Sequence, residues 1–448
     1  MNLFKKFVVI ALIITSCLAC TDVAKNRETE KPNVIIIYTD DQGTIDLNSY
    51  GAKDLVTPNM DQIVNSGIKF TQFYGAPVCS PSRAGLLTGK TPQRAGVPGN
   101  VGYSNGLKSE QYTMAEMFKD AGYKTALVGK WHLGHTLENQ PVSHGFDYSF
   151  GHLGGCIDNY SHFFYWAGPN RHDLYRNGEE IYLDGQFFPD LMVAEAAAFM
   201  KNNRTNPFFI FFALNTPHYP YQGTPEWLQY YKEKGLEYPR DLYAAFLSTQ
   251  DDKIGELMQE LEKLGLTENT IVVFQSDNGY STEERAHFGG GSSGIYRGNK
   301  FSLFEGGIRV PAAISWPAQL KAGEVRDQLA VNADWMPTLA ELCDIDLDTK
   351  ELDGKSLVPV INDKNLESLH SKGFCWQFQN HWVARKGDWK LLGNPSIHGE
   401  KFSAEDSLFL VNLKTDPGER TNLAKEFPDM VKELRVQYDR WLKYNAGQ

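Results

Sequence analysis

Asn33-Val-Ile-Ile-Ile-Tyr-Thr-Asp-Asp41 is the stretch of the sequence that decides the fold. Its first half is an unbroken apolar, β-branched run, which is typical of a strand buried on both faces in a parallel sheet covered by helices. Two carboxylates, Asp40 and Asp41, follow the strand directly. We therefore expect an α/β domain whose first strand delivers two acids to one edge of its sheet.

Further strand-like runs alternate with helical patterns and predict a large, mostly parallel sheet flanked by helices. The strand-like runs are Thr125–Val128, Phe208–Leu214, Thr270–Gln275 and Ile308–Ser315, and the helical patterns are Met60–Ser66, Met114–Ala121 and Leu242–Leu264. From about Lys372 the pattern changes to short alternating segments followed by a helix at Pro428–Tyr444. We expect a main domain over residues 32–370 and a small C-terminal subdomain, an antiparallel sheet plus a helix, over residues 371–448.

The charge balance constrains the partners of the chain. Its 448 residues include 44 Lys+Arg and 55 Asp+Glu, which gives a formal net charge of −11. Such a chain lacks the basic surface that neutralises nucleic-acid phosphates, so we expect no nucleic-acid partner. A small anion is still compatible with this charge, because a few convergent cations in one cleft reverse the local field.

The first twenty residues have the layout of a secretory signal, with two lysines, the apolar run Phe7–Ile14 and then small residues. Ile14-Thr-Ser-Cys17 resembles a bacterial lipobox, whose cysteine is lipidated and becomes the new N-terminus. We expect a lipoprotein signal peptide at 1–20, a polar tether at 21–31, and an exported protein in the periplasm or on the cell surface, anchored by lipid on Cys17. An ordinary cleaved signal peptide is the alternative.

The cysteines beyond the signal are too few to hold a disulfide scaffold. They are Cys79, Cys156, Cys343 and Cys375. We expect the last three to be buried small hydrophobic residues, and one disulfide among them stays open because export would allow it.

Polar side chains gather after the predicted strands, where open α/β sheets form their ligand sites. The strands are followed, in chain order, by Asp40-Asp41, by Lys130 and His132, by His218, and by Asp277-Asn278. Adjacent carboxylates at the end of a buried strand are costly to desolvate unless a cation lies between them. Their oxygen ligands suit calcium or magnesium better than zinc, and we predict one Ca²⁺. For Asp277-Asn278-Gly279 alone, ordinary turn chemistry is the alternative.

Cys79-Ser-Pro-Ser-Arg83 precedes a short helical pattern at Ala84–Thr88. A helix N-terminus lowers the pKa of a nearby thiol, so a plain thiolate nucleophile is one interpretation of Cys79. The segment continues as Ala-Gly-Leu-Leu-Thr-Gly-Lys90 and resembles the signature of the sulfatase family, in which the cysteine becomes formylglycine. Other sulfatase-like blocks follow the order of that family: Asp40-Asp41, Gly129–Gly134, His144–Asp147, Pro217-His218, Ser276–Gly279, Lys300 and Glu305–Pro311.

The resemblance implies an alkaline-phosphatase-like fold, a nucleophile and a metal site. Cys79 would be converted by a maturase to formylglycine (3-oxoalanine), whose hydrate supplies the hydroxyl that attacks sulfur, and Arg83 would orient that hydrate. The calcium ligands would be Asp40, Asp41, Asp277, Asn278 and the modified Cys79.

The same resemblance implies the remaining catalytic groups. Lys130 and Lys300 would bind sulfate and offset the charge that develops on its oxygens. His218 would protonate the departing oxygen, and His132 would take a proton so that sulfate leaves and the aldehyde returns. We therefore predict a sulfuric ester hydrolase, and its expected export favours a sulfated saccharide as the substrate, in glycosaminoglycans, mucin glycans or algal polysaccharides.

Two segments are candidates for substrate specificity. Gly151–Asp184 is dense in aromatic residues and histidines, and from it we select His162, Arg171 and His172 as candidate sugar-binding residues. Glu283–Arg297 is a candidate rim of the pocket, and its candidates are Glu284, His287 and Arg297. A packed surface loop is the alternative for the first segment.

Two other functions compete with this interpretation. One is a phosphatase, phosphodiesterase or phosphonate hydrolase of the alkaline phosphatase superfamily, because phosphate and sulfate are both tetrahedral. The other is a glycan-binding lipoprotein that has lost its chemistry. The intact set of catalytic residues argues against the second alternative.

Overall fold

The computed structural model describes residues 31–165 and 170–446. The predicted signal peptide, Cys17 and nearly all of the predicted tether lie outside the described residues. By its contacts the chain separates into residues 1–32 and one compact unit, Asn33–Gln448, which is the unit described below. No helix in the described part has both the length and the apolar character that crossing a membrane requires.

One large sheet forms the core of this unit, and its centre consists of parallel strands, as the sequence predicts. These are, in spatial order, β10 (Thr270–Ser276), β1 (Asn33–Thr39), β9 (Phe208–Ala213), β3 (Lys124–Lys130) and β4 (Tyr148–His152). Because they run in the same direction, their carboxyl ends lie along one edge of the sheet. The polar residues that follow β1, β3, β9 and β10 are therefore brought together.

The sheet continues beyond β10 and β4 through strands that are mostly shorter or antiparallel. On the β10 side lie β11 (Arg309–Ser315), β2 (Ile68–Tyr74), β12 (Glu324–Arg326) and β13 (Ala330–Val331), and on the β4 side lie β7 (Tyr175–Arg176) and β8 (Glu179–Glu180). The predicted strand at 308–315 is present as β11, but it runs antiparallel to β10 and β2. The sequence patterns did not identify β2 and β4, because polar residues and glycine interrupt their apolar runs.

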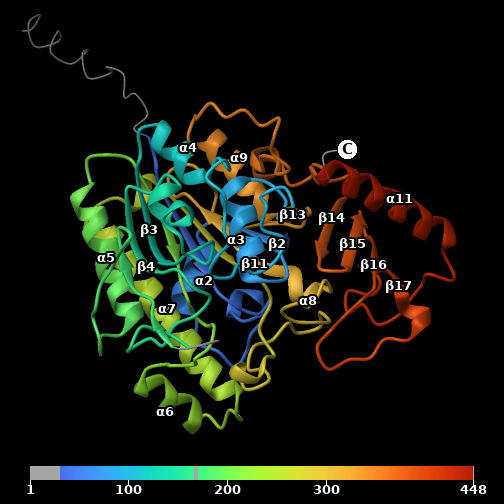
Figure 1. The fold of residues 1–448 in the computed structure, drawn as a ribbon, viewed down its shortest axis with the longest axis horizontal. Coiled ribbons are helices and arrows are strands. Elements are labelled where there is room, and N and C mark those ends of the chain that lie inside the picture. The colour runs from blue at the N-terminus through green and yellow to red at the C-terminus, as the bar shows by residue number, and fades with distance from the viewer. Residues whose placement is uncertain (1–30, 166–169, 447–448) are drawn as a thin grey trace, which may run out of the picture. The chain divides into compact units, whose positions relative to one another are not determined.

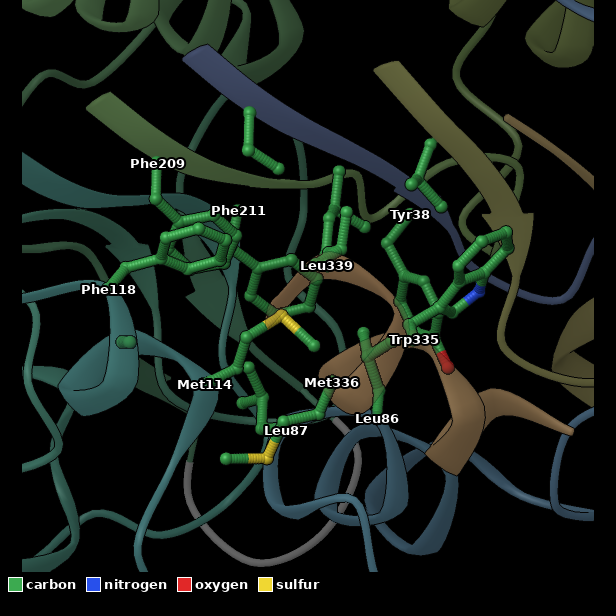
Figure 2. Close-up of a cluster of buried hydrophobic side chains, with 14 of the residues drawn as sticks. Tyr38, Leu86, Leu87, Met114, Phe118, Phe209, Phe211, Trp335, Met336 and Leu339 are labelled. Atoms are coloured by element: carbon green, nitrogen blue, oxygen red, sulfur yellow. The ribbon is translucent and has the colours of Figure 1, made fainter. Parts of the chain in front are cut away.

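Helices cover both faces of the sheet, and successive side chains of β1 alternate between these faces. Ile36 and Tyr38 pack on the side of α3 (Cys79–Thr88), α4 (Met114–Asp120) and α9 (Trp335–Leu342). Ile35 and Ile37 pack on the side of α2 (Pro58–Asn65), α5 (Phe188–Asn202) and α7 (Arg240–Lys263). Figure 2 shows the first of these cores, where Tyr38 and Phe211 from the sheet meet Leu86 of α3 and Leu339 of α9.

A second, antiparallel sheet and a helix form the C-terminal subdomain, as predicted (Figure 1). Its elements are β14 (Phe374–Phe378), β15 (His381–Lys386), β16 (Trp389–Gly393), β17 (Leu408–Asn412) and α11 (Pro428–Asn445). One face of this sheet packs with Tyr74 and Phe304 of the main domain, and the other packs with α11, where Trp382 stacks on Tyr438. By their contacts, the subdomain and the main domain belong to the same compact unit. The domain boundary near residue 370 stays a prediction.

A buried ion network joins the subdomain to the main domain. Lys390 of β16 lies 2.9 Å from Glu305, at the start of the short helix α8 (Glu305–Ile308), and 2.8 Å from Glu419, and all three side chains are buried. Burial alone would raise the pKa of Glu305, but the charges of Lys390 and Arg309 lower it to about 2. One ammonium group therefore holds two buried carboxylates at this junction.

Candidate active site

Four neighbouring parallel strands bring their following residues to one point, in agreement with the prediction from strand order. Asp41 N donates to Asp277 Oδ1 at 3.1 Å, which joins the end of β1 to the end of β10. Asn278 Nδ2 donates to Asp41 Oδ1 at 2.7 Å. Lys130, the last residue of β3, lies 2.6 Å from Asp40 Oδ2. The acids and the lysine that the sequence selects thus form one buried cluster.

Cys79 is the first residue of α3 and is buried against this cluster. Its Sγ lies 3.3 Å from Asp40 Oδ1 and 3.9 Å from Asp41 Oδ1. Burial, together with the charges of Asp277 and Asp40, raises the pKa of the thiol well above its usual value. Burial and the two carboxylates thus act against the lowering of this pKa that a helix N-terminus favours. This result argues against a plain thiolate nucleophile.

Arg83 lies one turn further along α3, and its side chain is fully buried. Its Nη1 donates to the carbonyl of Lys130 at 2.9 Å, and its Nη2 donates to Asp277 Oδ2 at 3.2 Å. The guanidinium also lies over the ring of Tyr38, 5.4 Å from the centroid. These contacts tie α3 to β3, β10 and β1 and so hold Cys79 in position.

The second predicted lysine comes from a loop remote in sequence. Lys300 Nζ donates to Asp41 Oδ2 at 2.9 Å and lies 3.4 Å from Glu283 Oε2. Together with Lys130, it places two ammonium groups around Cys79, and both charges oppose the rise in the pKa of that thiol.

The two predicted histidines also belong to this cluster. His218 Nδ1 lies 2.7 Å from the carbonyl of Tyr219, so Nδ1 carries the proton and Nε2 lies 3.5 Å from Asp41. His132 has a backbone φ of 54°, and a Cβ at Gly155 would come within 2.9 Å of its ring. Burial and the nearby Lys130 lower the pKa of His132 well below its usual value, so its ring is neutral and can accept a proton.

The acids form a group that fits a hard metal ion. One ligand atom each from Asp40, Asp41, Cys79 and Asp277 lies within 4.8 Å of the others, and all four residues are buried. Burial and the charge of Asp40 raise the pKa of Asp277 to about 7, although Arg83 opposes this change. Asn278 Oδ1 is buried without a hydrogen-bond partner. Crowded carboxylates beside an unused amide oxygen are the donors that a hard divalent cation takes.

A cavity of about 400 Å³ leads to this cluster. Cys79, His132, His218 and Lys300 line it together with aromatic and polar residues from surrounding loops. A substrate in this cavity would therefore lie against the proposed nucleophile, both histidines and one lysine.

Comparisons with known proteins identify the chain's family. The family model described as sulfatase matches residues 32–345, and the model described as N-sulphoglucosamine sulphohydrolase, C-terminal, matches residues 291–443. The chain belongs to the sulfatase family. It is a sulfuric ester hydrolase with the fold of its solved relatives.

Three relatives illustrate how far the similarity extends. N-acetylgalactosamine-6-sulfatase of Rattus norvegicus is 33% identical, over 90% of this chain and 84% of that protein. Arylsulfatase A of Bos taurus is 31% identical, over 93% of this chain and 90% of that protein. The crystal structure of Ps i-CgsB superposes with a TM-score of 0.82 at 28% identity, covering 92% of this chain and 93% of that chain, and it has also been solved with k-i-k-neocarrahexaose.

Of the six predicted specificity residues of this sulfatase, one lines the cavity and five do not. Arg171 lines the cavity, where its guanidinium lies 4.2 Å from the ring centroid of Phe164. The other five, which do not line the described cavity, are His162, His172, Glu284, His287 and Arg297. Their role in substrate binding stays a prediction.

These five residues have other surroundings. His162 and His172 are buried behind the cavity wall, Glu284 is exposed, and His287 lies 2.6 Å from the hydroxyl of Tyr238. Arg297 donates to the carbonyl of Glu419 at 3.0 Å and stacks on aromatic rings at the junction with the subdomain.

Sequence reasoning missed several residues that line the cavity of the sulfatase. They are Asn100, Tyr103, His135, Phe164, Tyr219 and Glu283. Most lie in loops without a regular period, so nothing in the sequence indicates which way they face. Phe164 and Glu283 lie in the two segments that we selected as candidates, although neither residue was itself selected.

The described cysteines form no disulfide with one another. Cys156, Cys343 and Cys375 are buried, as expected for small hydrophobic residues.

Proposed function

We propose that this sulfatase removes sulfate from a sulfated carbohydrate, using a hydrated formylglycine derived from Cys79 and one Ca²⁺. The observation that carries the proposal is the position of Cys79, on the cavity wall with its Sγ 3.3 Å from Asp40. When present, the modified side chain and its cation supply an activated hydroxyl and a centre that attracts sulfate. Asp40, Asp41, Asp277 and Asn278 would hold the cation.

The chain's own charges bind and orient the sulfate group. Lys130 and Lys300 supply positive charge beside Cys79, and this charge offsets what develops on the non-bridging oxygens as the ester bond breaks. Lys300 lines the cavity, whereas Lys130 and Arg83 do not, so Lys130 acts through its charge beside Asp40, 2.6 Å away, and Arg83 holds α3 and Asp277 in position. The two lysines thus act through their positive charge, and the arginine acts by holding the elements of the active site in position.

The two histidines move protons. His218 donates its Nδ1 proton to the Tyr219 carbonyl and lines the cavity, so a proton bound at its Nε2 would be the one that passes to the departing sugar oxygen. His132 is neutral and lines the same cavity, so it can take the proton whose removal releases sulfate. Burial lowers the pKa of both histidines, but Asp41 and Asp40 oppose this effect at His218, whereas Lys130 and Arg83 add to it at His132, so His218 is the better placed of the two to carry the second proton.

A carbohydrate substrate is supported by the cavity and by a solved relative. Aromatic rings and a guanidinium line the cavity, and such groups bind sugar faces and hydroxyl groups. The structure of Ps i-CgsB with k-i-k-neocarrahexaose shows that a protein of this fold, 28% identical, binds an oligosaccharide.

Mass spectrometry of the Cys79 peptide tests the nucleophile. Conversion of the thiol to an aldehyde lowers the peptide mass by about 18 Da. The Cys79→Ala variant should have no turnover. An unmodified peptide in a fully active preparation would show that the proposed nucleophile is wrong.

A panel of defined sulfated saccharides, each paired with its phosphate ester, tests the substrate class. We expect release of sulfate from at least one saccharide and much slower release of phosphate. Faster release of phosphate throughout the panel would favour the phosphatase alternative.

We also propose that the protein is an exported lipoprotein anchored through Cys17, and that a maturase in the same cell modifies Cys79. Palmitate labelling should mark the wild type and not the Cys17→Ala variant. Equal labelling of both proteins, or of neither, would contradict the anchor.

A further inference from the structure

A second group of metal-binding side chains lies behind the cavity wall, apart from the oxygen-rich cluster. His162, His172 and Asp184 each place one ligand atom within 4.8 Å of the others. His162 precedes β5 (Phe163–Phe164), His172 ends β6 (Arg171–His172), and Asp184 lies in the loop before α5. Three segments thus meet at one point.

Hydrogen bonds determine which nitrogen of each histidine is available. His162 Nε2 lies 3.0 Å from the carbonyl of Gln186, which can only accept, so the proton is on Nε2 and the lone pair is on Nδ1. His172 Nδ1 lies 3.0 Å from Glu180 Oε1, which leaves the lone pair on Nε2. Outer partners of this kind orient the histidine ligands of metal sites.

The two available nitrogens are buried and have no partner. His162 is 0% exposed and His172 is 8% exposed, and neither His162 Nδ1 nor His172 Nε2 has a hydrogen-bond partner in the described structure. Asp184 Oδ1 lies 4.0 Å from His172 Nε2, too far for a hydrogen bond.

We propose that His162, His172 and Asp184 bind one zinc ion, with water in the fourth position. Two imidazole nitrogens and one carboxylate oxygen are ligands that zinc prefers and calcium does not. Zinc bonds of about 2.0–2.2 Å require the three ligand atoms to approach one another. Asp184 can supply this movement because its side chain is 67% exposed.

The zinc site would hold in place the two-stranded ribbon of β5 and β6, which forms part of the cavity wall. Strands β5 and β6 pair Phe163 with His172 and Phe164 with Arg171. Neighbouring residues of a strand point to opposite faces, and Phe164 and Arg171 line the cavity. A metal bound behind the ribbon would therefore fix the side chains in front of it without touching the substrate.

Zinc titration of the metal-stripped full-length protein tests the proposal. Excess Ca²⁺ is kept present to saturate the oxygen-rich site, and bound zinc is measured by elemental mass spectrometry. We expect one zinc per chain in the wild type, together with the visible absorption of tetrahedral Co²⁺ when cobalt replaces zinc. An absence of stoichiometric zinc in the wild type would overturn the proposal.

Matched variants locate the site. His162→Ala combined with His172→Ala should lose the zinc, whereas His398→Ala, at an exposed histidine, should keep it. Glu180→Gln, which retains both ligands, should weaken binding by about 10–100-fold. Asp184→Asn changes an exposed side chain and should also weaken binding, so the test does not depend on the folding of the double variant. Retention of full affinity in both single variants would overturn the assignment.

Two further variants test whether the zinc site is distinct from the proposed catalytic site. Cys79→Ala and Asp277→Asn should bind zinc as the wild type does, because neither residue is near the histidine site. Loss of zinc in Asp277→Asn would place the metal in the oxygen-rich cluster instead. Zinc removal should raise KM for a saccharide and leave kcat on a small aryl sulfate unchanged, and an unchanged KM would overturn the positioning role.

Discussion

Lys130 Nζ lies 2.6 Å from Asp40 Oδ2, and both side chains are fully buried. Burial alone would raise the pKa of Asp40, but Lys130 and other nearby cations hold it well below its usual value. The lysine thus keeps the carboxylate of Asp40, a proposed metal ligand, ionised and supplies positive charge beside Cys79.

Lys130→Met should lower kcat/KM for an aryl sulfate by about 10²–10³, the effect of removing one charge-stabilising group from an active site. The matched control is Lys124→Met, at the exposed start of the same strand, which should keep nearly full activity. Both variants are checked for folding by circular dichroism. Nearly full activity of Lys130→Met would contradict its role at the sulfate.

Removal of divalent cations should abolish turnover, and Ca²⁺ should restore it, because the buried acids cannot otherwise share one site. Asp277→Asn should weaken calcium binding by more than about tenfold, as measured by calorimetry. Asp353→Asn removes a carboxylate that pairs with Arg94 outside the active site and should bind calcium normally. Equal calcium affinities of these two variants would disprove the assigned ligands.

Arg171→Met should raise KM for a saccharide substrate by about tenfold to a hundredfold, corresponding to one hydrogen bond from a charged donor. Hydrolysis of a small aryl sulfate, which does not reach the wall, should change little. His287→Ala lies outside the cavity and serves as the control. An equal effect of Arg171→Met on both substrates would indicate a general structural defect.

Lys390→Met should lower the free energy of unfolding by about 3–5 kcal/mol, because it removes the buried cation that Glu305 and Glu419 share, although Glu305 keeps its ion pair with Arg309. Lys386→Met removes a half-exposed ion pair with Glu433 and should cost less than about 1 kcal/mol. Denaturant unfolding measures both values. Similar costs for the two variants would contradict the importance of the buried network.

The defect of Lys390→Met should also depend on pH. In the wild type the pKa of Glu305 is lowered to about 2, so its contribution to stability is present above about pH 4.5 and is lost as the pH falls towards 2. Lys390 supplies the largest part of this lowering and Arg309 the next, so without Lys390 the contribution is reduced, and the difference in stability that comes from Glu305 should shrink as the pH falls below about 4.5. A difference that does not change with pH would argue against an electrostatic cause.

Much of the active site could be predicted from the sequence because parallel strands end at one edge of the sheet. The buried runs around Ile36 and Val273 predict parallel strands, so Asp40 and Asp277 were expected at the same edge of the sheet, and the structure shows that these two strands are neighbours. The block that begins at Cys79 identified the family, and the alternating segments after Lys372 identified the second sheet. Edge elements such as β4 were missed because their patterns are too short and too interrupted.

The specificity residues could not be selected in the same way. Arg171 and His172 are neighbours in a two-residue strand, yet one faces the cavity and the other is buried behind it. Arg297 looked like a rim residue but packs against the C-terminal subdomain, whose position no local pattern encodes.

The sequence by itself determined the fold class, the family and the set of candidate reacting side chains, because these follow from hydrophobic periodicity, from the residues at the strand ends and from contiguous motifs. Only the tertiary structure decided the protonation of Cys79, the wall of the cavity and the pairing of His162 with His172. These properties depend on burial and on distances between segments remote in sequence, since desolvation and nearby charge act through space.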